Sequence, residues 1–183
     1  MNYITKLQEN LLTAVQTSPY HEKTIVFGEG AEAPLLMMIG EAPGGDEEKQ
    51  GRPFVGKAGK NLSAFLEVVG LKREEIYISN VVKLRPTKES PKTGKAVNRP
   101  PSAEEIAFFL PFLQEEIQTI APKVLVTLGN VPLKAVTGEK SSGTIMADLW
   151  HWQTEGLCLH FIIRRRSFIT VACRRYMMRI CWS

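Results

Sequence analysis

Cysteine is absent from the first 157 residues of this 183-residue chain, and Cys158, Cys173 and Cys181 all lie in the last 26. A metal or cluster site built on paired cysteines is therefore excluded from most of the chain, and we predict no metal site. No apolar run approaches the roughly 18–20 residues that cross a bilayer, so we expect no membrane association. The amino-terminal residues lack the apolar block of a signal peptide, which favours a cytoplasmic protein.

Acidic residues are almost absent from the end of the chain. Residues 1–150 contain 17 Lys and Arg against 18 Asp and Glu, whereas residues 151–183 contain six arginines and one acid, Glu155. The net charge of +4 therefore arises in the tail, and any attraction of residues 1–150 to nucleic acid has to be local. We predict one globular domain over 1–150, followed by an aberrant basic tail over 151–183 that is not a separate domain.

Apolar segments alternate between helical and strand patterns. We expect helices over 4–17, 57–69 and 102–120, where Ser102 and Glu105 form a capping box, and a short helix after Gly129. Buried strands are predicted at 35–39, 76–82 and 124–128, with long loops over 40–56 and 83–101. Near-continuous apolar strands that alternate with helices indicate a parallel sheet covered on both faces. The prediction is an α/β fold, three-layer α/β/α, with a central parallel sheet of about four strands.

Each predicted strand ends in polar or turn residues. These are Glu41 after the first strand, Asn80 with Lys83 after the second, and the pair Gly129-Asn130 after the third. Right-handed crossovers bring the carboxyl ends of parallel strands to one edge of the sheet, where open α/β folds have their ligand crevice. We therefore expect these residues to converge on one site.

The first of these strand ends is rich in glycine. It reads G-E-A-P-G over Gly40, Glu41, Ala42, Pro43 and Gly44, so backbone N–H groups can approach a flat or anionic ligand. Glu41 is suited to hold or polarise a water molecule. The alternative is a plain turn with a solvated acid.

A phenylalanine and an asparagine are the other candidate ligand contacts. Phe54 lies between a proline and a residue that precedes glycine, so its ring can be presented as a stacking platform for a base, although it can equally fold back into the core. Asn80 interrupts an apolar strand, and its amide can read the polar edge of a base or merely end the strand.

Basic residues gather around these candidates. The residues predicted to bind DNA phosphates are Arg52, Lys57, Lys83, Arg85 and Arg99, with Lys60, Lys88, Lys92 and Lys95 nearby. A solvated, flexible loop over 83–99 is the alternative.

These segments together resemble the uracil-DNA glycosylase superfamily, most closely its family 4. The matching text includes G-E-A-P-G at 40–44, G-R-P-F-V-G-K-A-G at 51–59, I-Y-I-S-N-V-V-K at 76–83, N-R-P-P at 98–101 and A-P-K-V-L-V-T-L-G at 121–129. The resemblance covers roughly residues 24–137 in unbroken order.

The resemblance implies an enzyme of DNA base excision repair, a hydrolase that cleaves a flipped uracil from its sugar. It assigns Phe54 to stacking on the base, Asn80 to its polar edge, and Glu41 with the 40–44 backbone to the attacking water. The implied partner is DNA containing uracil, and we predict no obligate protein partner.

The chain departs from the family at its cofactor. Family 4 members commonly bind a four-iron four-sulfur cluster through four cysteines, but Leu84 and Phe109 stand at two of those positions and an amino-terminal Cys-X-X-Cys is absent. Leu and Phe fit hydrophobic packing in place of a cluster. We predict no cofactor.

A second departure is the missing His-Pro pair of the family, whose histidine stabilises charge on the departing base. The nearest candidates, His151 and His160, precede Trp152 and Phe161. Our hypothesis is a slip of reading frame between about 143 and 158, because a shifted reading of compatible codons can restore a His-Pro pair and turns Met177-Met178-Arg179 into Asp followed by a residue that can be Glu. We expect the slip to remove a strand and impair catalysis, since R-R-R beside F-I-T-V-A-C shows no strand or helix pattern. A genuine basic DNA-binding extension is the alternative.

Two rival functions remain open from the sequence. One is a non-catalytic DNA-binding descendant that uses the 83–99 loop. The other is a small-molecule nucleotide-binding protein, against which the chain lacks Gly-X-Gly-X-X-Gly and Gly-Lys-Ser/Thr phosphate loops.

Overall fold

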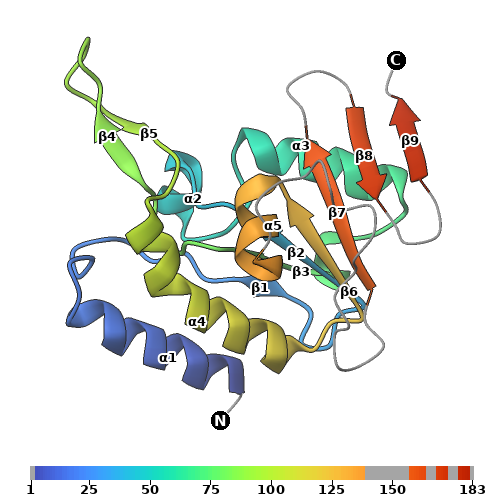
Figure 1. The fold of residues 1–183 in the computed structure, drawn as a ribbon, viewed down its shortest axis with the longest axis horizontal. Helices are drawn as coiled ribbons and strands as arrows, with labels where there is room; N and C mark the ends of the chain where they lie inside the picture. The colour runs from blue at the N-terminus through green and yellow to red at the C-terminus, as the bar shows by residue number, and fades with distance from the viewer. Residues whose placement is uncertain (1–2, 139–156, 164–167, 173–176, 182–183) are drawn as a thin grey trace.

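Parallel strands form the centre of the fold (Figure 1). The computed structural model describes residues 3–138, 157–163, 168–172 and 177–181. Within them, seven strands form one sheet in the order β1-β3-β2-β6-β7-β8-β9. Its members are β1 (Glu29–Gly30), β2 (Leu36–Gly40), β3 (Tyr77–Asn80), β6 (Val124–Leu128), β7 (Leu157–Ile163), β8 (Phe168–Ala172) and β9 (Met177–Cys181).

The four strands β3, β2, β6 and β7 run parallel to one another, so the predicted parallel centre of the sheet is confirmed. The edges differ from the prediction, because β1 pairs antiparallel with β3, and β8 and β9 continue antiparallel beyond β7. The sheet is therefore mixed. Antiparallel neighbours can be joined by short connections, as β7, β8 and β9 are, whereas β1 and β3 are far apart in the sequence.

Successive residues of β2 point into two different cores. Met37 and Ile39 belong to one cluster of buried side chains, and Met38, between them, belongs to the other. The first cluster includes side chains of α1 (Tyr3–Gln16) and α4 (Ala103–Ile120), and the second those of α3 (Lys57–Val68). The alternation confirms three layers, with helices on both faces of the sheet.

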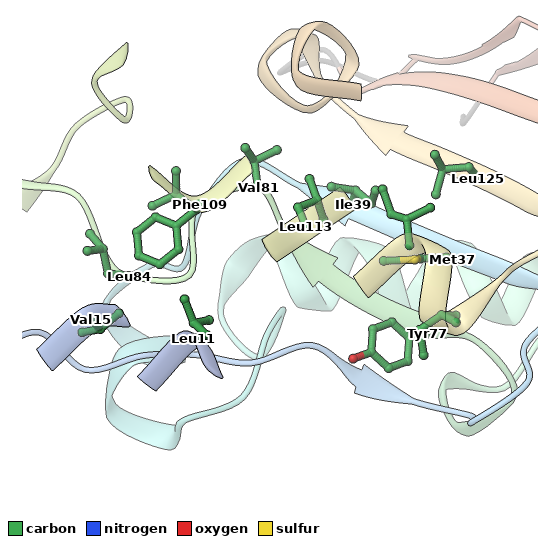
Figure 2. Close-up of a cluster of buried hydrophobic side chains, with 13 residues drawn as sticks. Leu11, Val15, Met37, Ile39, Tyr77, Val81, Leu84, Phe109, Leu113 and Leu125 are labelled. Atoms are coloured by element: carbon green, nitrogen blue, oxygen red, sulfur yellow. The ribbon is translucent and has the colours of Figure 1, made fainter. Parts of the chain in front are cut away.

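The larger core is drawn in Figure 2. Leu84 and Phe109 are 1% and 0% exposed and lie near Leu11 and Val15 of α1. Phe109 meets Phe108 edge to face, with ring centroids 4.9 Å apart. Apolar and aromatic side chains therefore fill the space between α1, α4 and the start of the 83–101 segment.

The helices agree with the sequence pattern where an apolar face marks them. α1, α3 and α4 confirm the predictions over 4–17, 57–69 and 102–120, and the hydroxyl of Ser102 accepts a hydrogen bond from the Glu105 amide as expected. α5 (Asn130–Thr137) is the predicted short helix. No helix in the described part of the chain is both long and apolar enough to span a bilayer.

Both predicted long loops contain regular structure. Helix α2 (Gly45–Gln50) lies within 40–56, and strands β4 (Thr87–Glu89) and β5 (Ala96–Asn98) form a hairpin within 83–101. The sequence pattern did not indicate them, because α2 consists mostly of charged residues and the hairpin is mostly exposed, so neither has apolar residues at regular spacing. Local pairing stabilises the hairpin, whose Ser90 amide donates to the carbonyl of Lys95. In Figure 1 the hairpin projects away from the rest of the molecule.

The expectation that the tail lacks a strand pattern and has lost a strand is wrong for the described backbone. β7 pairs parallel with β6. β8 covers Phe168–Ala172, a segment whose sequence shows no strand or helix pattern. Apolar and β-branched residues fit a strand wherever an open sheet edge supplies partners. The division of the chain at 150 stays a prediction, and the proposed slip region falls largely within 139–156, outside the described residues.

Candidate active site

The carboxyl ends of β2 and β3 lie side by side. Gly40 is opposite Asn80 in the parallel ladder. Beyond the ladder, the amides of Val81 and Val82 donate to the carbonyls of Gly40 and Glu41, at 2.9 and 3.1 Å. The two strand ends are thereby held in register, and Glu41 and Asn80 are brought to one edge of the sheet as predicted. Lys83 and the pair Gly129-Asn130 were expected to converge there too, but they do not line the cavity described next, so that part of the prediction is wrong.

Phe54 meets this edge from the loop between α2 and α3. A Cβ built on Gly40 would lie 2.4 Å from Cζ of Phe54 and 2.5 Å from Oδ1 of Asn80. A side chain at position 40 would therefore collide with both, and glycine is what allows the ring and the amide to approach the backbone. Phe54 is half-buried and also packs against the second core, so its ring is partly core and partly presented.

A cavity of about 380 Å³ opens beside these residues. Its lining includes Glu41, Ala42, Pro43 and Gly44, together with Phe54 and Asn80. Asn80 is only 3% exposed, so its amide faces this cavity rather than bulk solvent. The volume falls in the range typical of small-molecule sites.

Glu41 is the half-buried carboxylate of the cavity. Burial raises the pKa of Glu41 above the ordinary value of 4.5, because the charged form loses solvation. A carboxylate with a raised pKa is a stronger base, which suits proton transfer with a bound water. Glu41 is therefore not the fully solvated acid of the alternative interpretation.

Glu47 is a site residue that the sequence analysis missed. It is 8% exposed, and its carboxylate accepts hydrogen bonds from the amides of Gly44, Val55 and Gly56, at 3.0, 3.1 and 2.8 Å. It thus ties the glycine-rich turn to the segment that carries Phe54. The signal was a Gly44-X-X-Glu47 spacing, which is a capping pattern with glycine in place of the usual hydroxyl residue.

Three of the predicted DNA-binding arginines have carboxylate partners within the molecule. Arg52 pairs with Glu29 at 2.9 Å, Arg85 with Glu48 at 3.0 Å, and Arg99 with Glu105 at 2.7 Å.

Arg85 and Arg99 also fix the base of the hairpin. Arg85 donates to the side chain of Asn98, and Arg99 donates to the carbonyl of Thr87. Their first role is therefore to hold the hairpin against α2 and α4.

Lys57 is the predicted cation that is both exposed and part of the cavity lining. It is exposed, begins α3 and lines the cavity. The hairpin adds three further exposed lysines, Lys88, Lys92 and Lys95.

Lys83 is not a surface cation, and its predicted place on a phosphate-binding surface is wrong. Its side chain is 3% exposed, and its ammonium donates to Glu116 and Ser79, both at 2.5 Å. The hydroxyl of Tyr77 also donates to Glu116, at 3.0 Å. Burial and the Glu116 charge raise the pKa of Tyr77, so its phenol stays protonated and keeps that bond. A basic loop pattern cannot show that a carboxylate on a distant helix buries one of its lysines.

Within the described residues, no group of three or more His, Cys, Asp or Glu side chains is arranged to hold a metal ion. Position 84 carries a leucine and position 109 a phenylalanine, and both are buried in the larger core. Neither side chain has a donor atom that could bind iron.

The comparison with protein families agrees with this geometry. A profile described as "Uracil DNA glycosylase superfamily" matches residues 27–173, which is most of the chain. The chain belongs to the uracil-DNA glycosylase superfamily.

Individual members of the superfamily are similar to this chain at about 40% identity. A type-4 uracil-DNA glycosylase of Sulfurisphaera tokodaii is 38% identical over 138 residues, which cover 74% of this chain and 59% of that protein. One from Thermotoga maritima is 43% identical over 121 residues, covering 66% and 58%. One from Pyrobaculum aerophilum is 38% identical over 135 residues, covering 73% and 64%. The chain thus spans about half to two thirds of the length of these relatives.

The superfamily match continues beyond the predicted boundary at 150 into the region of β7 and β8.

The three histidines of the chain lie in different regions of the sequence. His160 of β7 is opposite Thr127 of β6 in the parallel ladder. His151 lies outside the described residues, and His21 is an exposed residue near the end of α1.

Replacing Lys83 with methionine tests its buried role. Lys83→Met leaves the Glu116 charge without its cation, which should lower the free energy of unfolding by about 3–5 kcal/mol. Chemical denaturation gives this value. Lys83→Met/Glu116→Leu, which removes both charges, should recover much of the loss. A stable Lys83→Met protein with weakened, less salt-dependent DNA binding would instead restore the surface assignment.

Proposed function

We propose that this chain removes uracil from DNA by hydrolysing the N-glycosidic bond. The observation that carries the proposal is the convergence of Glu41, Phe54 and Asn80 on one cavity of about 380 Å³. Relatives named type-4 uracil-DNA glycosylases, at about 40% identity, support the same activity. An acid, an aromatic ring and an amide are the groups needed to activate water, stack a base and read its polar edge.

The base enters the cavity by leaving the helical stack. Enzymes that act on a base extrude its nucleotide into a pocket, where the base is held by stacking and by hydrogen bonds to its Watson–Crick edge. Phe54 supplies the stacking surface, and the buried Asn80 amide both donates and accepts. Glycine at position 40 lets the Phe54 ring and the Asn80 amide lie close together at the end of β2, where both can contact the same base.

Glu41 orients the attacking water. Its side chain lines the cavity at the end of β2, half-buried, in the environment that raises its pKa. The ionised carboxylate accepts a proton from the water as the water attacks the sugar carbon, while the bond to uracil breaks and the base leaves with its electron pair.

DNA contacts are proposed around the mouth of the cavity. Lys57 lines it, and the β4–β5 hairpin, which carries Lys88, Lys92 and Lys95, starts from cavity residues Pro86, Asn98 and Arg99. Lysines that neutralise phosphates release counterions, so binding should weaken steeply with salt. Arg52, Arg85 and Arg99 contribute to this surface through the guanidinium N–H groups that their carboxylate partners leave available. A cytoplasmic location and the lack of an obligate protein partner stay predictions.

Uracil release from a single-stranded oligonucleotide is the test of this activity. Glu41→Gln should lower kcat by about 10²–10⁴-fold, because the base that takes the proton of water is lost. Glu67→Gln on the exposed face of α3 is the matched control and should leave the rate unchanged.

The pH dependence of kcat/KM shows whether the ionised form of Glu41 is the active one. Since only the ionised carboxylate acts, kcat/KM should fall as pH drops through a pKa above the ordinary 4.5, and Glu41→Gln should lose this acid limb. Equal rates for Glu41→Gln and wild type would contradict the assignment. DNA binding with no release by any variant would favour a non-catalytic DNA-binding descendant, which the missing His-Pro pair also suggests.

We further propose that the protein folds without an iron–sulfur cluster. Leu84 and Phe109 pack in the larger core at two positions where the family commonly has cysteine ligands. The purified protein should contain no iron, and a chelator should leave its melting temperature unchanged.

The Phe109 side chain should carry the stability in place of a cluster. Phe109→Ala should lower the free energy of unfolding by about 3–5 kcal/mol, whereas Tyr3→Ala, at an 80% exposed position, should change it little. Stoichiometric iron, or unfolding by the chelator, would overturn this proposal.

The tail is proposed to result from a slip of reading frame that removed the His-Pro pair. Loss of one donor that stabilises developing charge costs about 10²–10³-fold in kcat. A protein with the restored frame should therefore release uracil that much faster than this chain when both are assayed at a temperature where both are folded. Equal rates, or sequencing that shows relatives with the same R-R-R-S-F-I-T text, would contradict the slip.

A further inference from the structure

The backbone of Phe54 has an unusual conformation. Its φ is +53°, and within the described residues Ala121, the C-cap of α4, is the other non-glycine residue with a positive φ. L residues are sterically disfavoured in this left-handed region. Such a conformation persists when surrounding contacts determine it, and it is informative at a candidate site.

Arg73 holds the two carbonyls at this position. One terminal nitrogen of its guanidinium, Nη1, donates to the carbonyl of Phe54 at 3.1 Å, and the other, Nη2, donates to the carbonyl of Pro53. Arg73 begins the 3₁₀ turn η1 (Arg73–Glu75), which follows α3 and precedes β3. The contact therefore joins the Phe54 loop to the segment that leads into the Asn80 strand.

Glu29 fixes the guanidinium of Arg73 in turn. The Glu29 carboxylate accepts from Nε and Nη2 of Arg73, at 3.3 and 2.9 Å, and also pairs with Arg52. Burial alone would raise the pKa of Glu29, but hydrogen bonds and charges from Arg52 and Arg73 outweigh it and lower the pKa, so the carboxylate stays ionised. Glu29 lies in β1, which pairs with β3, so Arg73 is anchored to the sheet itself.

The other side of Phe54 is equally constrained. The next two amides, of Val55 and Gly56, donate to Glu47. A Cβ on Gly59 would lie 1.9 Å from the carbonyl oxygen of Phe54, so the peptide fits only because position 59 is glycine. With both peptide groups held, the ring is directed toward Gly40 and Asn80.

We propose that Arg73, held by Glu29, is a positioning residue that fixes the Phe54 ring for stacking on the flipped base. This inference rests on the proposed function, because it assigns a role in that same site. Arg73 does not line the cavity and so acts through Phe54. The planar fork of arginine can donate to two adjacent carbonyls and a carboxylate at once, which the single ammonium of lysine cannot reproduce.

Kinetics of Arg73 variants test the proposal. Arg73→Gln should lower kcat/KM for uracil release by about 10- to 100-fold, the cost of a small misplacement of a positioned group. Arg73→Lys should recover part of the activity, and millimolar guanidinium should rescue Arg73→Ala. Lys72→Gln, which removes one exposed charge from the adjacent position, is the matched control and should keep the wild-type rate.

A double-mutant cycle shows whether Arg73 acts through Phe54. In a Phe54→Ala background, Arg73→Gln should cause no further loss, because the ring that it positions is gone. Fully multiplicative losses at a temperature where all variants are folded would overturn the proposal. So would a wild-type rate for Arg73→Gln.

A spectroscopic readout separates this inference from the proposed function. With 4-fluorophenylalanine at all eight phenylalanines, the ¹⁹F resonance of residue 54 can be assigned by its loss in Phe54→Leu. It should shift or broaden in Arg73→Gln and stay unchanged in Lys72→Gln. An unchanged resonance in Arg73→Gln would overturn the positioning role. If the wild type releases no uracil but the expected ¹⁹F change is seen, the proposed function is overturned, while the positioning of the Phe54 ring by Arg73 is established.

Discussion

The register of β2 against β3 determines where every side chain of the candidate site lies. Gly40 is opposite Asn80, and the hydrogen bonds of the next two amides continue the pairing past Glu41. A shift by one residue would turn Asn80 to the other face of the sheet, among the α1 and α4 side chains. A shift of β2 by one residue would place a side chain where the ring of Phe54 now meets the backbone of Gly40.

Buried polar groups on the face of β3 opposite the cavity stabilise this register. Tyr77 and Ser79, which alternate with Asn80 along β3, both donate to Glu116 of α4, and Lys83 neutralises that carboxylate. One face of β3 is thus fixed to α4 by a charged network. The opposite face is then free to present Asn80 to the cavity. Such a network is costly to break, since each partner has few alternatives in the interior.

The loop that carries Phe54 is built on a similar principle. Glu47 binds the amides after Phe54, and Arg73 binds the carbonyls before and at it. Glycines at 40 and 59 supply the space on either side. Charged side chains therefore hold the loop peptides, while the loop leaves an aromatic face toward the cavity. This arrangement fixes the position of the aromatic ring without a regular element at that point of the chain.

Hydrophobic packing stabilises the region around Leu84, where the segment that carries the β4–β5 hairpin begins. Leu84 and Phe109 join the aromatic group of Tyr20 and Phe108 between α1 and α4. Arg85 directly follows Leu84 and pairs with Glu48 of α2. Arg99, at the other end of the hairpin segment, pairs with Glu105 of α4. The proposed cluster-free fold thus has a continuous path of contacts from the core to the rim of the cavity.

The sequence by itself determined the alternation of helices and strands, the parallel centre of the sheet and the meeting of Glu41 and Asn80, whereas the place of Phe54 beside them was implied only by the family resemblance. Apolar periodicity and the polar residues at strand ends carry that information locally, and the right-handed crossover rule converts it into a common edge. It did not reveal α2 or the hairpin, whose residues have no apolar period. Only the tertiary structure decided that Lys83 is buried and that Glu47 and Arg73 hold the Phe54 loop. Each of those assignments depends on a partner supplied by a distant segment, and charge alone does not indicate which carboxylate or carbonyl will be within reach.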